Sequence, residues 1–540
     1  MTLRSALVLA SAAALLGLVL LVPNRPSAMA LQAFTRVPLE LPVLLGLMLV
    51  LSPYPGLARA CRAVIVVALL VVLLLKAADF TIYESFSRPF NLVIDMFVVP
   101  AGMNLLTGAL GQMGAVAVAV GAILALISIA WSIWWALGRW ARLTPGRVGR
   151  RTAGAVAIVS AGLVVADTGH MLGNWTLPEN PPGSALTTRL AVAHVARASR
   201  TAQDLADFRQ AADRDSWADA DGVFDLLDGR DVLIVFLESY GRASFDNPLY
   251  ADSHVPQLRD AQAALDAQGL AMRSLWLTSP IQGGQSWLAH GTFASGLEIG
   301  DQGRYRAMLA SPRQTLFHLA AKAGYRTGAV MPAITMSWPQ GPLVGFETIL
   351  AAADLGYAGA PFNWVTMPDQ YTLAAYPARL ADDPRPDFLQ IALISSHAPW
   401  TPVPWMLDWD AVGDGTEFNA MAAAGETPRQ VWKDRDRVRA HYRDAVAYTL
   451  EATFSFVERQ AGPDAPLIIV LGDHQAAPSI AQTDTMDVPI HLIGPPDLLA
   501  RIDTWGATEG LLPAADAPVW PMEAFRDRFI AAFTSGSGES

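Results

Sequence analysis

Five apolar stretches in the first third of the chain constrain its fold more than any other feature of the sequence. Each is nearly free of charge, and with its flanks it approaches the roughly 17–25 residues that a helix needs to cross a bilayer. They are residues 5–22, 41–51, 64–75, 115–137 and 153–165. The chain is 52% hydrophobic, and the excess lies here. We therefore expect an α-helical transmembrane anchor of about five spans in residues 1–172.

Two further details define this anchor. Residues 41–51 are the weakest span, because prolines interrupt or end the stretch. Residues 90–110 include the charged Asp95, and we interpret them as a re-entrant or interfacial segment rather than a sixth span. The first stretch has the composition of a signal peptide, but the spans that follow it favour a retained anchor.

The basic residues of the short loops predict the orientation of the anchor, since cytoplasmic loops are enriched in arginine and lysine. With the N-terminus inside, the cytoplasmic loops carry Arg4, Arg59, Arg62, Arg139, Arg142, Arg147, Arg150 and Arg151. The opposite side carries Arg25, Arg36, Lys76 and Arg88. Five spans with this polarity place everything after about residue 170 outside the cytoplasm.

Residues 173–222 begin with a proline-rich exit and continue as an alanine-rich segment, which predicts a juxtamembrane linker helix. Residues 223–534 then alternate between strand and helix patterns, and 535–540 form a Gly/Ser tail that we expect to be disordered. The single cysteine, Cys61, lies in the anchor, so the exported domain has no disulfide. The net charge of −11 argues against a nucleic-acid partner.

Two apolar runs of the exported domain end in possible metal ligands. Residues 232–237 are followed by Glu238, and residues 466–471 lead through a glycine into Asp473 and His474. Short unbroken apolar runs predict strands buried on both faces, and open α/β sheets build their sites beyond the carboxyl ends of such strands. We therefore expect Glu238, Asp473 and His474 to meet in one metal centre at one edge of a sheet.

A serine and a further histidine complete the candidate set. Ser286 follows a glycine turn and stands at a predicted helix start, where free N–H groups and the helix dipole favour phosphate and an alkoxide. The alternative is that Ser286 is only an N-cap, the commonest role of serine at that position. His397 follows another buried run, residues 388–394, and so shares the strand-end position of the metal ligands.

The alternation of strands and helices predicts a mainly parallel sheet with helices on both faces. Carboxylate oxygens and one imidazole suit Zn²⁺ or Mn²⁺. Each ligand also has a plain structural alternative: Glu238 in an ion pair, Asp473 in a turn, His397 capping a carbonyl. His491 lies within a strand pattern and is interpreted as a packed histidine. The remaining histidines are interpreted as structural, namely His170, His194, His254, His290 and His318.

In this order the motifs resemble the alkaline phosphatase and sulfatase superfamily, and within it the membrane-anchored lipoteichoic acid synthase and phosphoglycerol transferase branch. Leu237-Glu238-Ser239 and Gly472-Asp473-His474 match the metal-binding motifs of that branch. Ser286-Trp287-Leu288-Ala289 matches the nucleophile segment, where threonine is usual, and residues 396–400 resemble a substrate-side Ser-His-x-Pro-aromatic motif. The anchor with an exported C-terminal domain is similar as well.

The resemblance implies a transferase of the bacterial inner (cell) membrane, with a periplasmic or extracellular catalytic domain. One Mn²⁺ or Zn²⁺ would be held by Glu238, Ser286, Asp473 and His474. The head group of a phospholipid donor would pass to Ser286 and then to an envelope glycan or lipid acceptor, with His397 on the substrate side. Trp338 resembles the substrate-contacting aromatic residue of the branch. The nearby arginine that binds phosphoglycerol is not evident, so phosphoethanolamine is the second choice after phosphoglycerol.

Three rival functions share part of this pattern. A sulfatase needs a Cys/Ser-x-Pro-x-Arg context for its formylglycine, whereas Ser286 is followed by Trp-Leu-Ala-His. A phosphodiesterase-type hydrolase, with water as the acceptor, has the same ligand set and stays open. A membrane-bound sensor with an inactive domain is disfavoured, because such a domain has no physical reason to keep four ligands.

Overall fold

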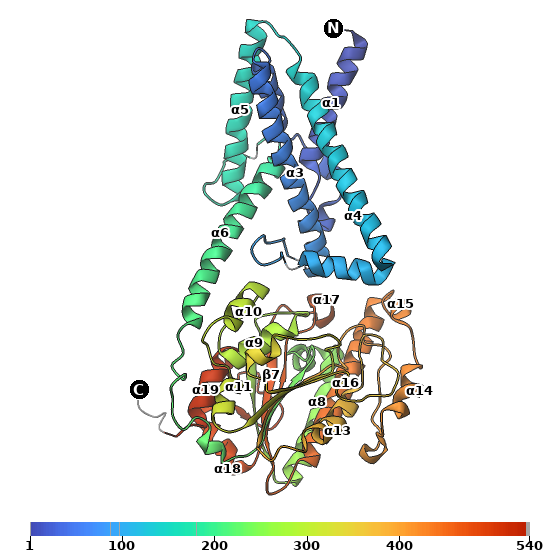
Figure 1. Ribbon diagram of the computed structural model, residues 1–540, viewed down its shortest axis with the longest axis vertical. Coiled ribbons are helices and arrows are strands. Elements are labelled where there is room, and N and C mark those ends of the chain that lie inside the picture. Colours follow the sequence, from blue (N-terminus) through green and yellow to red (C-terminus); the bar gives the residue numbers. More distant parts are fainter. Residues whose placement is uncertain (1, 87, 97, 180, 536–540) are drawn as a thin grey trace. The chain divides into compact units, whose positions relative to one another are not determined.

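The structure is a computed structural model that describes residues 2–86, 88–96, 98–179 and 181–535 (Figure 1). The chain forms two compact units, Met1–Asp204 and Leu205–Ser540. Helix α6 (Leu186–Ala212) begins in the first unit and ends in the second, and it occupies the predicted linker. Five residues of the predicted tail, 536–540, lie outside the described residues.

The first unit is the expected multi-pass helical anchor. In the described part of the chain, four helical segments are long and apolar enough to cross a membrane, and they are Leu3–Leu21, Pro55–Tyr83, Leu110–Ala141 and Arg147–Met171. They belong to α1 (Leu3–Leu21), α3 (Pro55–Phe86), α4 (Val98–Ala141) and α5 (Arg147–Met171). The fifth predicted span corresponds to the shorter helix α2 (Glu40–Val50). Its eleven residues rise about 16 Å, which is well short of a hydrocarbon core of about 30 Å.

The predicted interfacial segment is the first part of α4. Gly111 has φ +72°, which breaks the helical backbone there. The residues before Gly111 consequently form a helix that points in a different direction from the rest of α4 (Figure 1). This arrangement separates the segment from the span that follows it.

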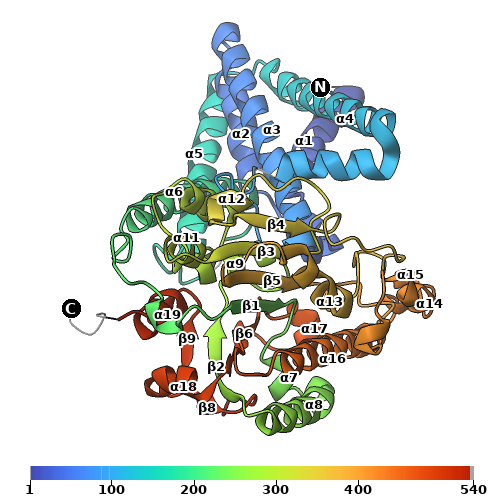
Figure 2. The same cartoon turned by 60° about the horizontal axis from the view of Figure 1, so that its bottom comes forward.

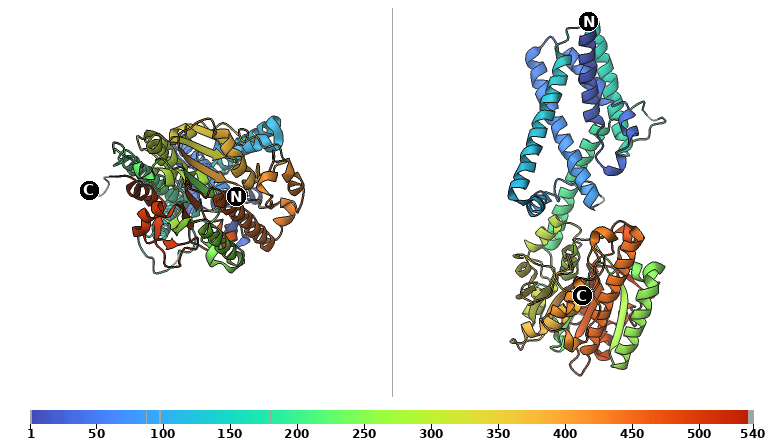
Figure 3. Two further views of the ribbon diagram at one scale, coloured as in Figure 1. Left: turned by 90° about the horizontal axis from the view of Figure 1, so that it is seen from below. Right: turned by 90° about the vertical axis from the view of Figure 1, so that its right-hand side faces the viewer.

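Polar contacts within this unit define the direction of each helix. Near the end of α3, the ammonium group of Lys76 donates to the carbonyl of Leu20 at the end of α1 (3.0 Å). Near the start of α3, Arg62 donates to the carbonyl of Trp134 in the last part of α4 (2.6 Å). Helices α1 and α3 therefore run in the same direction and α4 runs in the opposite one (Figure 3).

The chain leaves this unit at the end opposite to the N-terminus of α1. Thr187, in the first turn of α6, donates its hydroxyl to the carbonyl of Leu20 (2.7 Å). The backbone N–H of Leu39, just before α2, donates to the carbonyl of Ser184 (3.2 Å). Helix α2 thus starts at the exit end, and the connection from α2 to α3 returns the chain to the other end despite the shortness of α2.

The second unit is built on a nine-stranded sheet in the order β4-β3-β5-β1-β6-β7-β2-β8, with β9 paired to β2. The strands are β1 (Val232–Leu237), β2 (Ala271–Thr278), β3 (Arg326–Met331), β4 (Thr348–Ala351), β5 (Asp387–Leu393), β6 (Leu467–Gly472), β7 (Asp487–Gly494), β8 (Thr508–Glu509) and β9 (Val519–Pro521). Strand β7 is antiparallel to β6 and β2, and β8 is antiparallel to β2. The other ladders between the described strands are parallel, so the mainly parallel sheet is confirmed (Figure 2).

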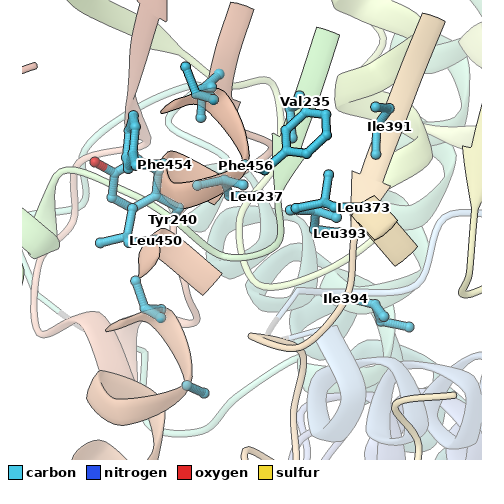
Figure 4. Packing of buried hydrophobic residues seen from close by; sticks show 14 of the residues in the cluster. Val235, Leu237, Tyr240, Leu373, Ile391, Leu393, Ile394, Leu450, Phe454 and Phe456 are labelled. Carbon is cyan, nitrogen blue, oxygen red and sulfur yellow. The ribbon is translucent and has the colours of Figure 1, made fainter. Parts of the chain in front are cut away.

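Helices cover both faces of the sheet. They are α7 (Ala243–Asp246), α8 (Pro248–Ala267), α9 (Ser286–Ser295), α10 (Gln302–Leu309), α11 (Leu316–Lys322), α12 (Gly341–Val344), α13 (Asp369–Leu380), α14 (Asn419–Ala422), α15 (Pro428–Val431), α16 (Arg435–Arg459), α17 (Pro478–Ala481), α18 (Pro496–Leu499) and α19 (Ala524–Ala532). All six side chains of β1 are buried, and alternate ones face opposite cores. Leu233, Val235 and Leu237 pack with α8, α13 and α16 (Figure 4), whereas the intervening residues pack with α9, α11 and α19.

The register of the central strands brings the predicted ligands to one level. Strand β1 lies between β5 and β6, and its last residue, Leu237, is paired with Leu393 on one side and Gly472 on the other. All three strands are parallel, so the residues that follow them emerge at the same edge of the sheet.

Candidate active site

Glu238 and Asp473 are neighbours because β1 and β6 are adjacent and end together. Gly472 permits the close approach, since a Cβ at this position would lie 2.8 Å from the carbonyl carbon of Tyr240 and nearer still to its oxygen. Glycine is therefore required where the two strand ends meet. The predicted meeting of the two strand-end motifs is what the structure shows.

Four candidate ligand side chains converge at this point. Nε2 of His474 lies 3.3 Å from Oε1 of Glu238 and 3.7 Å from Oδ2 of Asp473. The hydroxyl of Ser286 donates to Oε2 of Glu238 (2.9 Å) and lies 3.3 Å from Nε2 of His474. Ligand atoms of Glu238, Asp473 and His474 all lie within 4.8 Å of one another.

The position of Ser286 differs from that of an N-cap. Gln285 is the N-cap residue of α9, with φ +68°, and Ser286 is the first helical residue. No side chain caps this helix in the described structure, and the hydroxyl of Ser286 is directed to Glu238 instead. The preceding turn is fixed by the N–H of Gly283, which donates to the carbonyl of Gln475 (2.9 Å), just after His474. The segments carrying Ser286 and His474 are thus bonded to each other.

Backbone and hydroxyl groups hold the ligand residues in place. Oδ1 of Asp473 accepts the backbone N–H groups of Ser239 (2.8 Å) and His474 (2.6 Å). The hydroxyl of Ser396 donates to the carbonyl of Glu238 (2.7 Å). Ser239 has φ +59°, a conformation that costs a non-glycine residue about 1–3 kcal/mol and that persists only when its surroundings enforce it. Together with Gln285, this places strained residues next to two of the ligands.

The electrostatics of the site show an excess of negative charge. Burial raises the pKa of Asp473, and the facing Glu238 carboxylate raises it further. Burial opposes the protonated form of His474, but the two carboxylates outweigh this effect and raise its pKa to about 9. Burial likewise opposes the ionised form of Glu238, yet the charges of His474 and His397 lower its pKa. A positive charge is therefore stabilised at this point.

These residues fit a divalent cation. Two buried carboxylates face each other, and none of the described arginine or lysine side chains forms an ion pair with either. Two carboxylates, an imidazole nitrogen and a hydroxyl are donors that suit Zn²⁺ or Mn²⁺. The raised pKa of His474 has the same physical origin as the affinity for a cation, namely the unbalanced charge of Glu238 and Asp473.

His397 lies close to this group but outside it. Its Nδ1 is 2.6 Å from the carbonyl oxygen of Ala398, which fixes the proton on Nδ1 and leaves Nε2 available. Its charge contributes to the lowered pKa of Glu238. In the same loop, the ring of Trp400 stacks with that of Trp432, with centroids 5.8 Å apart and an interplanar angle of 3°. The place of His397 on the substrate side and its catalytic role stay predictions.

The other predicted residues are placed as follows. Trp338 packs against Phe346 (ring centroids 5.8 Å) in the apolar cluster beneath the β3–β4 segment, and its proposed contact with substrate stays a prediction. His491 is buried between the hydroxyls of Ser274 (2.8 Å) and Tyr240 (3.2 Å). Burial lowers the pKa of His491 to about 3, so it is a neutral packed histidine, as interpreted from the sequence.

One supporting residue was missed by the sequence analysis. Asp369, at the start of α13, is buried and accepts the N–H groups of Ile394 (2.8 Å) and Ser395 (2.9 Å) and the hydroxyl of Thr449 (2.7 Å). It thereby holds the segment that carries His397. His290, one of the histidines interpreted as structural from the sequence, lies one turn beyond Ser286 in α9 and is buried, with a ring centroid 4.1 Å from that of Phe236.

Comparison with known protein families agrees with this geometry. Residues 230–487, which contain all four candidate ligands and His397, match the family model described as Sulfatase. Over these residues the chain is similar to the sulfatase family. The α/β sulfatase-like fold expected from the motifs is thus confirmed. No curated protein sequence matches the chain.

Several solved structures are similar to the chain at low identity. The lipoteichoic acid synthase LtaP from Listeria monocytogenes is 15% identical (TM-score 0.35), over 54% of this chain and 70% of that chain. The lipooligosaccharide phosphoethanolamine transferase EptA from Neisseria meningitidis, an integral membrane protein, is 14% identical (TM-score 0.46), over 98% and 96%. The phosphoglycerol transferase GacH from Streptococcus pyogenes is 13% identical (TM-score 0.34), over 61% and 80%.

Proposed function

We propose that the sulfatase-like domain is a metal-dependent transferase that moves a phospholipid head group through a covalent intermediate on Ser286. The observation that carries this proposal is the position of the Ser286 hydroxyl. It lies 2.9 Å from Glu238 and 3.3 Å from His474, inside a set of cation ligands and at the N-terminus of a ten-residue helix. A hydroxyl beside a cation site and free backbone N–H groups is suited to attack a phosphorus centre.

The distribution of exposed apolar side chains supports an amphiphilic donor. Eight large apolar residues of the second unit are exposed in the described structure, and seven of them lie in the connections that follow β1 to β5, outside the strands. These seven are Leu249, Trp287, Met336, Leu343, Trp364, Trp405 and Trp432. The four exposed tryptophans in these connections favour contact with lipid, because indole rings prefer the membrane–water interface.

The chain's own residues account for the proton transfers of a two-step exchange. In the first step the oxygen of Ser286 forms a bond to phosphorus and the bond from phosphorus to the diacylglycerol oxygen breaks. The proton of Ser286 leaves along its hydrogen bond to Glu238, and His397 gives a proton to the departing diacylglycerol oxygen. In the second step an acceptor hydroxyl replaces Ser286 on phosphorus, gives its proton to His397, and Ser286 regains its proton.

Glu238, Ser286, Asp473 and His474 would hold one divalent ion, Mn²⁺ or Zn²⁺. When bound, such an ion lowers the pKa of the coordinated hydroxyl and stabilises charge on the phosphoryl oxygens. The backbone contacts of Asp473 and the bond from Ser239 to its carboxylate keep the donor atoms together before any ion arrives. Phosphoglycerol is the head group that we propose first, and phosphoethanolamine is the alternative.

The covalent step can be tested on the full-length protein in detergent. The protein is incubated with phosphatidylglycerol or phosphatidylethanolamine without an acceptor, and its intact mass and the released diacylglycerol are measured. We expect one head-group phosphate on Ser286 and none on Ser286→Ala. The matched control is Ser295→Ala at the other end of α9, whose buried hydroxyl has no hydrogen-bond partner in the structure and should be dispensable.

The outcomes separate the alternatives. Full release of diacylglycerol by Ser286→Ala would exclude the covalent mechanism. If the adduct is lost as free head-group phosphate as fast as diacylglycerol is released, the enzyme is a hydrolase, with water as the acceptor. The mass of a stable adduct decides between glycerol and ethanolamine.

We further propose that the sulfatase-like domain is on the outer side of a bacterial inner membrane. The start of α1 and the exit into α6 lie at opposite ends of the membrane unit, and the arginine-rich loops are at the end where α1 starts. A reporter fused after Ser199 should therefore be active when it requires export, as alkaline phosphatase does. Activity only from a reporter that requires the cytoplasm would contradict this orientation.

A further inference from the structure

A cavity of about 650 Å³ lies within the membrane unit, at the end where the chain exits. Its walls come from the end of α1, the connection that follows α1, the end of α5 and the first two turns of α6. The lining residues are Leu21, Pro23, Asn24, Arg25, Ala28, Ala30, Ala33, Arg36, Tyr83, Met171, Leu172, Ser184, Leu186, Arg189, Leu190 and Ala193. The candidate active site uses none of these residues.

The polar part of the lining is positive. Three arginines contribute to it, and no aspartate or glutamate occurs among the lining residues. Arg25 and Arg36 form no ion pair with any described residue, whereas Arg189 pairs with Asp167 behind the wall. The Nε of Arg189 is nevertheless buried without a hydrogen-bond partner. The cavity thus has the unbalanced charge of two arginines and an unsatisfied buried donor, which together favour an anion.

The rest of the lining is apolar and lies at the depth of the helix ends. Leu21 ends α1 after 19 residues, a rise of about 28 Å that matches the thickness of a hydrocarbon core. Leu186 and Leu190 of α6 and Met171 of α5 form the apolar wall, and Tyr83 stands with them. A cationic part beside an apolar part, at the level where a membrane changes from hydrocarbon to head groups, is complementary to a phosphate joined to acyl chains.

Backbone bonds hold the walls together, so the cavity is part of the fold. The N–H of Ser184 donates to the carbonyl of Val37 (2.9 Å), and the N–H of Leu39 returns to the carbonyl of Ser184 (3.2 Å). The N–H of Ala185 donates to Asp167 at the end of α5 (2.8 Å). These bonds join the connection after α1 to the segment that precedes α6, on either side of the cavity.

We propose that this cavity binds one anionic phospholipid of the leaflet at the exit end of the membrane unit. Arg25, Arg36 and Arg189 contact its phosphate, and its acyl chain lies along Leu186 and Leu190. The guanidinium groups supply paired N–H donors that match phosphate oxygens. This binding site is separate from Ser286, and the proposal holds whether or not the sulfatase-like domain transfers head groups.

The test is native mass spectrometry of the delipidated full-length protein, titrated with phosphatidylglycerol and, separately, with zwitterionic phosphatidylcholine. We expect one tightly bound molecule of phosphatidylglycerol and weaker binding of phosphatidylcholine. Arg25→Gln and Arg36→Gln should each weaken phosphatidylglycerol binding about fivefold, and the double variant about 25-fold. Both side chains are exposed, so the variants should unfold at the temperature of the wild type.

The matched control is the double variant Arg147→Gln/Arg150→Gln, which removes the same charge at the opposite end of the unit and should change the affinity less than twofold. An equal loss of phosphatidylglycerol affinity in this control would show that the lipid is held by general attraction to surface charge, and it would overturn the proposal. Wild-type affinity in Arg25→Gln/Arg36→Gln would overturn it as well. Complete displacement of the lipid by an equal concentration of inorganic phosphate would show a site for free phosphate instead. Ser286→Ala should keep the bound lipid, which separates this proposal from the transfer reaction.

Discussion

Gly472→Ala should disrupt the metal centre without touching a ligand. The added methyl carbon would stand 2.8 Å from the carbonyl carbon of Tyr240, even closer to its oxygen, and 3.2 Å from Cβ of Val488. Carbon atoms in ordinary contact are about 3.5–4.0 Å apart, so the ends of β1 and β6 must separate by roughly 1 Å. Tyr240 is two residues from Glu238, and the displacement therefore moves Glu238 away from Asp473.

The cost can be estimated from overpacking in other cores, which is typically 1–3 kcal/mol. The backbone carbonyl cannot rotate away, so we expect the upper end, about 3 kcal/mol, and a midpoint of thermal unfolding about 6 °C lower for a domain of this size. The assay is thermal unfolding of the full-length protein in detergent, with and without Mn²⁺ or Zn²⁺. The wild type should be stabilised by the ion and the variant should gain little.

Gly300→Ala is the matched control, because a Cβ there meets only the carbonyl of Pro280 at 3.8 Å. It should unfold with the wild type and respond fully to the ion. If Gly472→Ala also retained both the wild-type midpoint and the full metal response, the close approach of the two strands would not be what assembles the site.

Two further predictions concern buried polar residues of the second unit. Burial lowers the pKa of His254 to about 4, below the value of 6.5 in the unfolded chain, so its contribution to stability is complete above pH 6.5 and is lost as the pH falls towards 4. His254→Gln should therefore reduce the pH dependence of the unfolding free energy by about 1.4 kcal/mol per pH unit in that window. A variant with the pH dependence of the wild type from pH 7.5 to 4.5 would contradict this. Asp369→Ala removes the acceptor for Ile394, Ser395 and Thr449. It should lower the free energy of unfolding by about 3 kcal/mol, and it should slow head-group transfer while changing the affinity for metal less. Asp382→Ala, at an exposed position, should do neither, and equal effects of the two variants would show that Asp369 does not position His397.

The parts of the site that follow from strand geometry were predictable. Glu238, Asp473 and His474 follow apolar runs, and parallel strands necessarily end at a common edge, so their meeting needed no knowledge of the loops. The sequence could not decide whether Ser286 caps its helix or faces the metal ligands. Either Gln285 or Ser286 can begin a helix, and only the bond from Ser286 to Glu238 distinguishes the two residues.

Residues whose positions depend on long connections were beyond such reasoning. Trp338 lies in a segment whose course is set by packing against Phe346 rather than by any repeat. Asp369 is 25 residues from Ile394 in sequence, and no local pattern indicates that their backbone groups are bonded. In the membrane unit, the apolar composition predicted the helices well, but the length of α2 was set by the prolines around it.

The placement of β1 at the centre of the sheet has a consequence for biosynthesis. This strand is synthesised before all the others, yet its partners are β5 and β6, and the amide of Ser239 must find a carboxylate 234 residues further on. During synthesis β1 therefore remains without its neighbours until most of the domain has been made, which exposes an entirely apolar strand to chaperones and proteases in the meantime. A chain that stops before Asp473 contains Glu238 and Ser286 but lacks Asp473 and His474, so it cannot enclose an ion. Synthesis must be nearly complete before the site can form, so truncated chains should have no activity.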